Sequence, residues 1–110
     1  MVGEDGPHTL NDAGFDKFIR DNALAAVDFW APWCGPCTKM GPNFEALAKV
    51  YHGKIAFAKV NVDDNQATAQ KFGIMSIPSI LLFKSGKMVH QMVGFVPKEM
   101  LDAELKKHLL

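Results

Sequence analysis

The 110-residue sequence contains only two cysteines, too few for the disulfide scaffold of a small secreted protein. It has no excess of either charge, because 12 Lys and Arg residues balance 12 Asp and Glu residues. This balance gives no reason to expect binding to nucleic acid or to an anionic membrane. No apolar run approaches the length of a membrane span, and the acidic segment 1–8 lacks the apolar stretch of a secretory signal. We therefore expect a cytoplasmic protein in a reducing compartment.

Hydrophobic residues make up 48% of the sequence, enough for one core without cross-links. The length suits a single domain, expected at residues 9–110 after an N-terminal tail at residues 1–8. Strands are predicted at 25–30, 55–62, 80–83 and 88–93, with a weaker one between 6 and 10, and helices around 15–19, 34–51, 66–72 and 97–109. This alternation predicts an α/β fold in which a mixed sheet of four or five strands has helices on both faces.

The two cysteines are separated by two residues, a spacing that allows a disulfide across one helical turn. The strand before them ends near Trp30, and a helix is predicted to begin near Cys34. The first turn of a helix has free N–H groups and a partial positive charge, which should lower the pKa of the Cys34 thiol. Cys37 lies one turn further in, where we expect it to be less exposed. Cys34 is therefore the predicted attacking thiol and Cys37 the resolving one.

Three other interpretations of the pair are weaker. A structural disulfide over so short a loop would contribute roughly 2 kcal/mol, against about 3 kcal/mol for a fifteen-residue loop. Half of a zinc site would need a second pair of ligands. The histidines show no ligand spacing along the chain, and we predict no metal site; they are His8, His52, His90 and His108. Two inert buried cysteines would not explain the flanking Trp, Gly and Pro.

Other residues near the pair allow two interpretations each. Strand alternation alone favours an outward, solvated Asp28, whereas a sheet covered on both faces would bury it and raise its pKa. Lys59, on the next predicted strand, is either a solvated lysine or a partner of Asp28. The frequency of cis X–Pro bonds, about 5–6%, favours trans at Pro78. Val93 and Phe95 are ordinary core residues or part of a binding surface.

The segment 27–37, which ends in Trp-Cys-Gly-Pro-Cys, resembles the active-site signature of the thioredoxin family. Segments 58–63, 73–78 and 93–94 resemble further motifs of that family, in the same order. The resemblance extends over about residues 10–110, so it implies the thioredoxin fold for the whole domain.

The resemblance also implies roles for individual residues. Asp28 would accept a proton from Cys37 and return it, and Lys59 would modulate Asp28. The bond before Pro78 would be cis, opposite the cysteines. Substrate would dock on a mostly apolar surface around Cys34 and the intervening Gly35 and Pro36. The expected members of this docking surface are Trp33, Ile77, Pro78, Val93, Gly94 and Phe95.

The predicted activity is that of a protein disulfide reductase. Gly35 and Pro36 add neither charge nor a side-chain donor beside the thiolate, so the pair should be a good reductant. Thioredoxins work without a bound cofactor, and the resemblance implies electrons from a separate thioredoxin reductase, protein disulfides as substrates and a monomer. The alternative is a non-catalytic binding or chaperone module with the same fold.

Overall fold

The computed structural model describes residues 6–109, so residues 1–5 of the expected tail lie outside it. Short elements alternate along the chain, as predicted for an α/β protein. In order they are β1 (His8–Thr9), α1 (Phe15–Asp21), β2 (Leu24–Trp30), α2 (Gly35–Val50), β3 (Ala56–Asn61), α3 (Gln66–Lys71), β4 (Ser79–Lys84), β5 (Lys87–Val93) and α4 (Lys98–Leu109). None of these helices is both long and apolar enough to cross a membrane.

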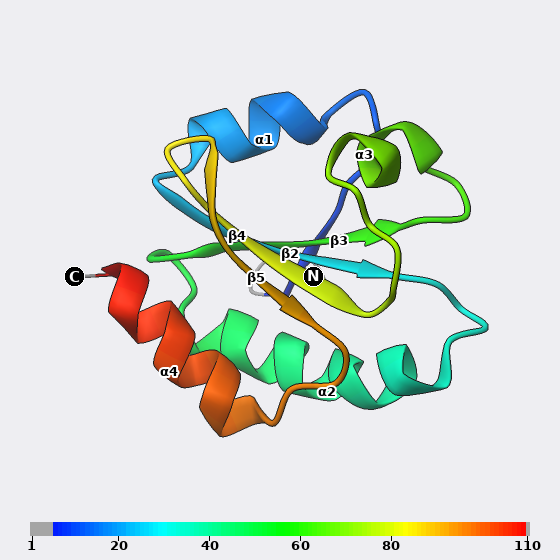
Figure 1. Cartoon of the computed structure of the whole chain (residues 1–110). Coiled ribbons are helices and arrows are strands. Elements are labelled where there is room, and N and C mark those ends of the chain that lie inside the picture. Colours follow the sequence, from blue (N-terminus) through cyan, green and yellow to red (C-terminus); the bar gives the residue numbers. More distant parts are fainter. Residues whose placement is uncertain (1–5, 110) are drawn as a thin grey trace.

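Within residues 6–109 the strands form one five-stranded sheet in the order β1-β3-β2-β4-β5. β1, β3 and β2 are parallel, β4 runs antiparallel to β2, and β5 runs antiparallel to β4. Helices α1 and α3 cover one face, and α2 and α4 cover the other (Figure 1). The predicted mixed sheet with helices on both faces is confirmed.

Alternation along β2 supplies both halves of the core. Ala25, Val27 and Phe29 pack with Phe15 of α1 on one face of the sheet. Leu24 and Ala26 point to the other face, where they join residues of α2 and α4, among them Met40, Phe44, Leu101 and Leu105. Because side chains alternate, Asp28 belongs to this second face, beneath α2. The core therefore brings a carboxyl group under the helix that carries the cysteines.

The turn between β4 and β5 follows from two residues. Ser85 and Gly86 have positive φ angles of 51° and 84°. Two residues with positive φ fit the type I′ turn, whose twist matches that of a β-hairpin. The hairpin leads β5 back along β4 and delivers its last residue, Val93, opposite Ser79 at the start of β4.

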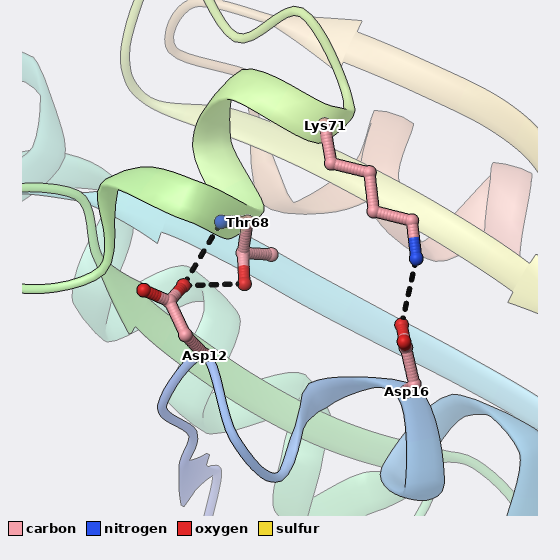
Figure 2. Close-up of polar contacts among 4 residues, drawn as sticks. All are labelled: Asp12, Asp16, Thr68 and Lys71. Atoms are coloured by element: carbon pink, nitrogen blue, oxygen red, sulfur yellow. Dashed lines mark hydrogen bonds and ion pairs between the residues drawn. The ribbon is translucent and has the colours of Figure 1, made fainter.

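Helix α3 is capped from outside its own segment. The side chain of its N-cap residue, Asn65, makes no capping hydrogen bond. Instead, Oδ1 of Asp12 accepts hydrogen bonds from the Thr68 backbone N–H at 2.9 Å and from Thr68 Oγ1 at 2.6 Å (Figure 2). These bonds hold the pKa of Asp12 below its usual value. The nearby Asp16–Lys71 ion pair, at 2.9 Å, lies in solvent.

The two aspartates are expected to differ in their effect on stability. Asp12→Ala leaves an N-terminal N–H of α3 without its partner and should lower the Tm by several degrees. Asp16→Ala removes a solvated ion pair and should lower the Tm by less. Thermal unfolding followed by circular dichroism compares the two variants. Equal shifts would show that Asp12 does not cap α3.

Candidate active site

The cysteine pair lies where β2 passes into α2. Cys34 and Cys37 are joined by a disulfide. Cys34 is the N-cap of α2, with extended backbone angles of φ −88° and ψ 112°, and its Sγ accepts the Cys37 N–H at 3.2 Å. The pair is thus held at a helix N-terminus, as predicted. A thiolate at Cys34 would receive the same N–H and the positive end of the helix dipole.

Exposure does not separate the two cysteines as we expected. Cys37 is 4% exposed and Cys34 is 5% exposed, so the difference has the expected direction but is too small to distinguish the two sulfurs in this disulfide form. Both sulfurs pack with Ala31, and with the partly buried Val62 and Ile77. The difference between them is electrostatic, because Sγ of Cys34 accepts the helix N–H.

Asp28 is fully buried, so the interpretation based on a doubly covered sheet is the correct one. Within the described part of the chain, neither of its carboxyl oxygens has a hydrogen-bond partner. Burial without compensation disfavours the charged form and raises the pKa of Asp28 from 3.8 to about 6, although the charge of Lys59 opposes the shift. Such a carboxyl group changes protonation close to neutral pH.

Lys59 lies beside Asp28 in the register of β2 and β3. Its ammonium group lies 4.6 Å from the centre of the Trp30 ring, a cation–π geometry, and a Cβ on Gly41 of α2 would come within 3.9 Å of it. It is half-buried rather than the fully solvated lysine of the simpler interpretation. Among the ion pairs of residues 6–109, none joins Lys59 to Asp28. The Lys59 charge therefore lowers the pKa of Asp28 without a direct contact between the two groups.

The loop before β4 faces the cysteines. The Ile77–Pro78 bond is cis, as the family resemblance implies. The Ile77 carbonyl oxygen lies 3.7 Å from Cys34 Sγ. The Pro78 carbonyl accepts the Gly94 N–H at 2.8 Å, and Gly94 has a positive φ of 87° that suits glycine. The Ile77–Pro78 loop thus contacts both the cysteine segment, through Ile77, and Gly94, through Pro78.

The expected docking surface is open in part. Trp33, Val93 and Phe95 are 70%, 58% and 47% exposed, so neither Val93 nor Phe95 is an ordinary core residue. Ile77 and Gly94 are half-buried, and Pro78 is buried. Gly35, Pro36 and Phe95 line a recess of about 520 Å³ together with Lys39. Trp33, Gly35 and Pro36 flank Cys34 in the chain, and Phe95 adds an exposed apolar side chain to the recess beside them.

Asp63 is a contact that the sequence did not reveal. The Trp33 indole N–H lies 3.0 and 3.2 Å from the two carboxylate oxygens of Asp63. The residues are 30 apart, but β2 and β3 are parallel neighbours in which Trp30 pairs with Asn61. Strand pairing, which no local pattern encodes, therefore brings Asp63 beside the exposed Trp33 ring.

Two of the histidines lie close together in the structure, although the four show no ligand spacing along the sequence. The rings of His90 on β5 and His108 on α4 have centroids 6.0 Å apart. The two residues are 18 positions apart and meet because α4 folds back along β5. The sequence spacing therefore gave no sign of this pair.

The combination of fold and site defines a class of protein. Thiol–disulfide oxidoreductases exchange electrons through two nearby cysteines, one of them activated at a helix N-terminus. The Cys34–Cys37 disulfide at the start of α2, with Asp28 buried beneath that helix, places the chain in this class.

Comparison with known proteins places the chain more closely. The family model "Thioredoxin" matches residues 6–107. The chain is 50% identical over 97 residues to a thioredoxin of Alicyclobacillus acidocaldarius, covering 88% of this chain and 92% of the relative. It is 50% identical over 93 residues to thioredoxin 2 of Chlorobaculum tepidum, covering 84% and 85% of the two chains.

A solved structure agrees with the sequence comparisons. A point-mutant thioredoxin from Halobacterium salinarum superposes with a TM-score of 0.89 at 32% identity, covering 100% of this chain and 96% of the other. The chain belongs to the thioredoxin family. It is a thiol–disulfide oxidoreductase that reduces disulfides through the Cys34–Cys37 pair.

Proposed function

We propose that Cys34 is the nucleophile that reduces protein disulfides and that Cys37 resolves the intermediate. The Cys34 thiolate attacks one sulfur of the substrate disulfide, and the other substrate sulfur leaves as a thiolate that takes up a proton. The Cys37 thiol then loses its proton and attacks Sγ of Cys34. The second substrate sulfur leaves, two electrons have passed to the substrate, and the Cys34–Cys37 disulfide remains. The observation that carries this assignment is the Cys37 N–H aimed at Cys34 Sγ.

Asp28 is the proposed proton acceptor for Cys37. It lies beneath α2, it is buried, and its pKa of about 6 leaves it mostly ionised at neutral pH yet close enough to hold a proton. Lys59 limits the rise of that pKa and so keeps the carboxylate available as a base. The proton returns to Cys37 when the disulfide is reduced again.

Gly35 and Pro36 are proposed to set the direction of the chemistry. They are exposed and lie between the two sulfurs, where a charged or hydrogen-bonding side chain would stabilise the Cys34 thiolate. Because neither residue supplies one, the reduced form gains less stability and gives up its electrons more readily.

The proposed docking surface consists of Trp33, Ile77, Pro78, Val93, Gly94 and Phe95. Its exposed members offer apolar contact area, and the Ile77 carbonyl, 3.7 Å from Cys34 Sγ, can accept a backbone N–H from an extended substrate. The space beside Gly94 is open to a substrate backbone, since apart from its two chain neighbours no heavy atom of the described residues would lie within 4 Å of a Cβ there.

Val93→Asp tests this docking surface. A charge at position 93 should raise the KM for insulin several-fold, because apolar area is replaced by a solvated carboxylate, while the rate with a small aromatic disulfide changes little. Val89→Asp is the matched control, an exposed valine on the same strand four residues away. Equal KM values for insulin in the two variants would show that Val93 does not contact substrate.

We further propose that a separate thioredoxin reductase restores the dithiol, because the chain contains no glycine motif for binding a nucleotide. No bound cofactor is required, since both electrons reside on the two thiols. We expect a monomeric, cytoplasmic protein that occupies residues 9–110 as one domain. Consumption of NADPH by a flavoprotein reductase from the same cell, on addition of the oxidised protein, tests this part. Reduction by a ferredoxin-linked reductase alone would assign a different electron donor.

A further inference from the structure

A cluster of three potential metal ligands lies apart from the cysteines. His90 comes from β5, and Glu104 and His108 come from α4. Glu104 and His108 are four residues apart, so they lie on one face of the helix. The C-terminal end of α4 lies on the opposite side of the molecule from the N-terminus of α2 (Figure 1). The disulfide chemistry therefore makes no use of this cluster.

The two imidazoles both face one carboxylate oxygen of Glu104. Nε2 of His90 lies 3.6 Å from Glu104 Oε2, and Nε2 of His108 lies 3.8 Å from the same atom. Both separations are longer than an ordinary hydrogen bond, about 2.7–3.2 Å. The other carboxylate oxygen, Oε1, is held by the Lys107 ammonium at 3.0 Å. Lys107 thus orients the carboxylate so that Oε2 faces both imidazoles.

These separations suit ligands around a metal ion. Zinc binds nitrogen and oxygen at about 2.0–2.2 Å, which places neighbouring ligand atoms of a tetrahedron about 3.3–3.6 Å apart. One ligand atom from each of the three residues lies within 4.8 Å of the others. The largest closure needed is therefore about 1.4 Å, a distance that side-chain rotation can supply. All three residues are partly buried, so water can complete the coordination.

The geometry points to a Zn²⁺ site formed by His90, Glu104 and His108, with water in the remaining position. Two neutral imidazoles and one carboxylate form a donor set that zinc accepts, and the charge of Glu104 offsets half of the ion's charge. Because the ligands come from two elements, the bound ion links the last turns of α4 to β5. Binding should therefore stabilise the folded protein.

Zinc titration of the oxidised protein tests the site. The disulfide form, purified without a histidine tag, is used because reduced Cys34 and Cys37 would themselves bind the ion. Calorimetry should give one Zn²⁺ per chain, and a zinc concentration about a hundred times Kd should raise the Tm by on the order of 10 °C. His90→Ala, His108→Ala and Glu104→Gln should each weaken binding at least about tenfold.

His52→Ala is the matched control, because it removes an exposed histidine outside the cluster and should leave the affinity unchanged. Far-UV circular dichroism verifies that each variant is folded. If an alanine variant does not fold, Glu104→Gln still tests the site, because glutamine has nearly the same size as glutamate. The site is wrong if the oxidised wild-type protein binds no stoichiometric Zn²⁺. It is also wrong if His90→Ala and His108→Ala both retain wild-type affinity.

Discussion

Cys34→Ser should reduce the rate of insulin disulfide reduction by at least roughly a thousandfold, to the background rate of dithiothreitol alone. A serine hydroxyl stays protonated at neutral pH even at a helix N-terminus. The backbone N–H of Cys37, which donates to the side chain at position 34, then has no anion to stabilise. The turbidity that follows insulin reduction measures the loss. A binding module with incidental cysteines would show no such dependence on Cys34.

Cys37→Ser is the matched control for that experiment. It should still attack substrate through Cys34, but the mixed disulfide should accumulate because no second thiol resolves it. Mass spectrometry of the variant mixed with a protein disulfide should detect the covalent adduct. Unchanged turnover in Cys34→Ser would reject Cys34 as the nucleophile. An adduct on Cys37 of Cys34→Ser, with none on Cys34 of Cys37→Ser, would reverse the assigned roles.

Asp28→Asn should make the oxidised protein more stable at about pH 8, by about 3 kcal/mol. The folded-state pKa of about 6 lies roughly two units above the ordinary value of 3.8, and each unit corresponds to about 1.4 kcal/mol. Because the folded state binds this proton more tightly than the unfolded state does, ionisation opposes folding. The penalty is absent below about pH 4, grows between about pH 4 and 6, and is complete above that range. Asparagine removes the charge in almost the same volume.

Urea unfolding at about pH 4 and pH 8 measures this gain and its pH dependence. Asp64→Asn, at an exposed position, is the matched control and should show no comparable gain. The same Asp28→Asn variant should release a trapped substrate more slowly than wild type while forming the mixed disulfide at a similar rate. A stability gain without slower release would show that Asp28 is buried for a reason other than proton transfer.

The sequence predicts the scaffold because each element carries its own local pattern. β2 is an almost continuous apolar run, as expected of a strand covered on both faces, and the structure extends it by one residue, to Leu24. The start of α2 follows from the position of the cysteines, and the hairpin follows from Ser85 and Gly86. β1 has only two residues, and the pairing of His8 with Ala58 holds it in place, so no local pattern fixes its ends.

The site is less predictable because it depends on which faces are covered. Alternation alone favours a solvated Asp28, and only the presence of α2 over that face of the sheet makes the residue buried. The hydrogen bond from Trp33 to Asp63 depends on parallel strand pairing, and the pairing of His90 with His108 depends on where α4 folds back. Both of these contacts join residues at least 18 positions apart, beyond the range of periodicity and capping signals.

Alkylation of the fully reduced protein by iodoacetamide at about pH 7 tests most directly whether the helix N-terminus activates one sulfur. Peptide mapping after short exposure should find Cys34 modified at least about ten times faster than Cys37, and faster than free cysteine in the same solution. Modification of both cysteines at the rate of free cysteine or below would contradict the claim that the N-terminus of α2 activates Cys34.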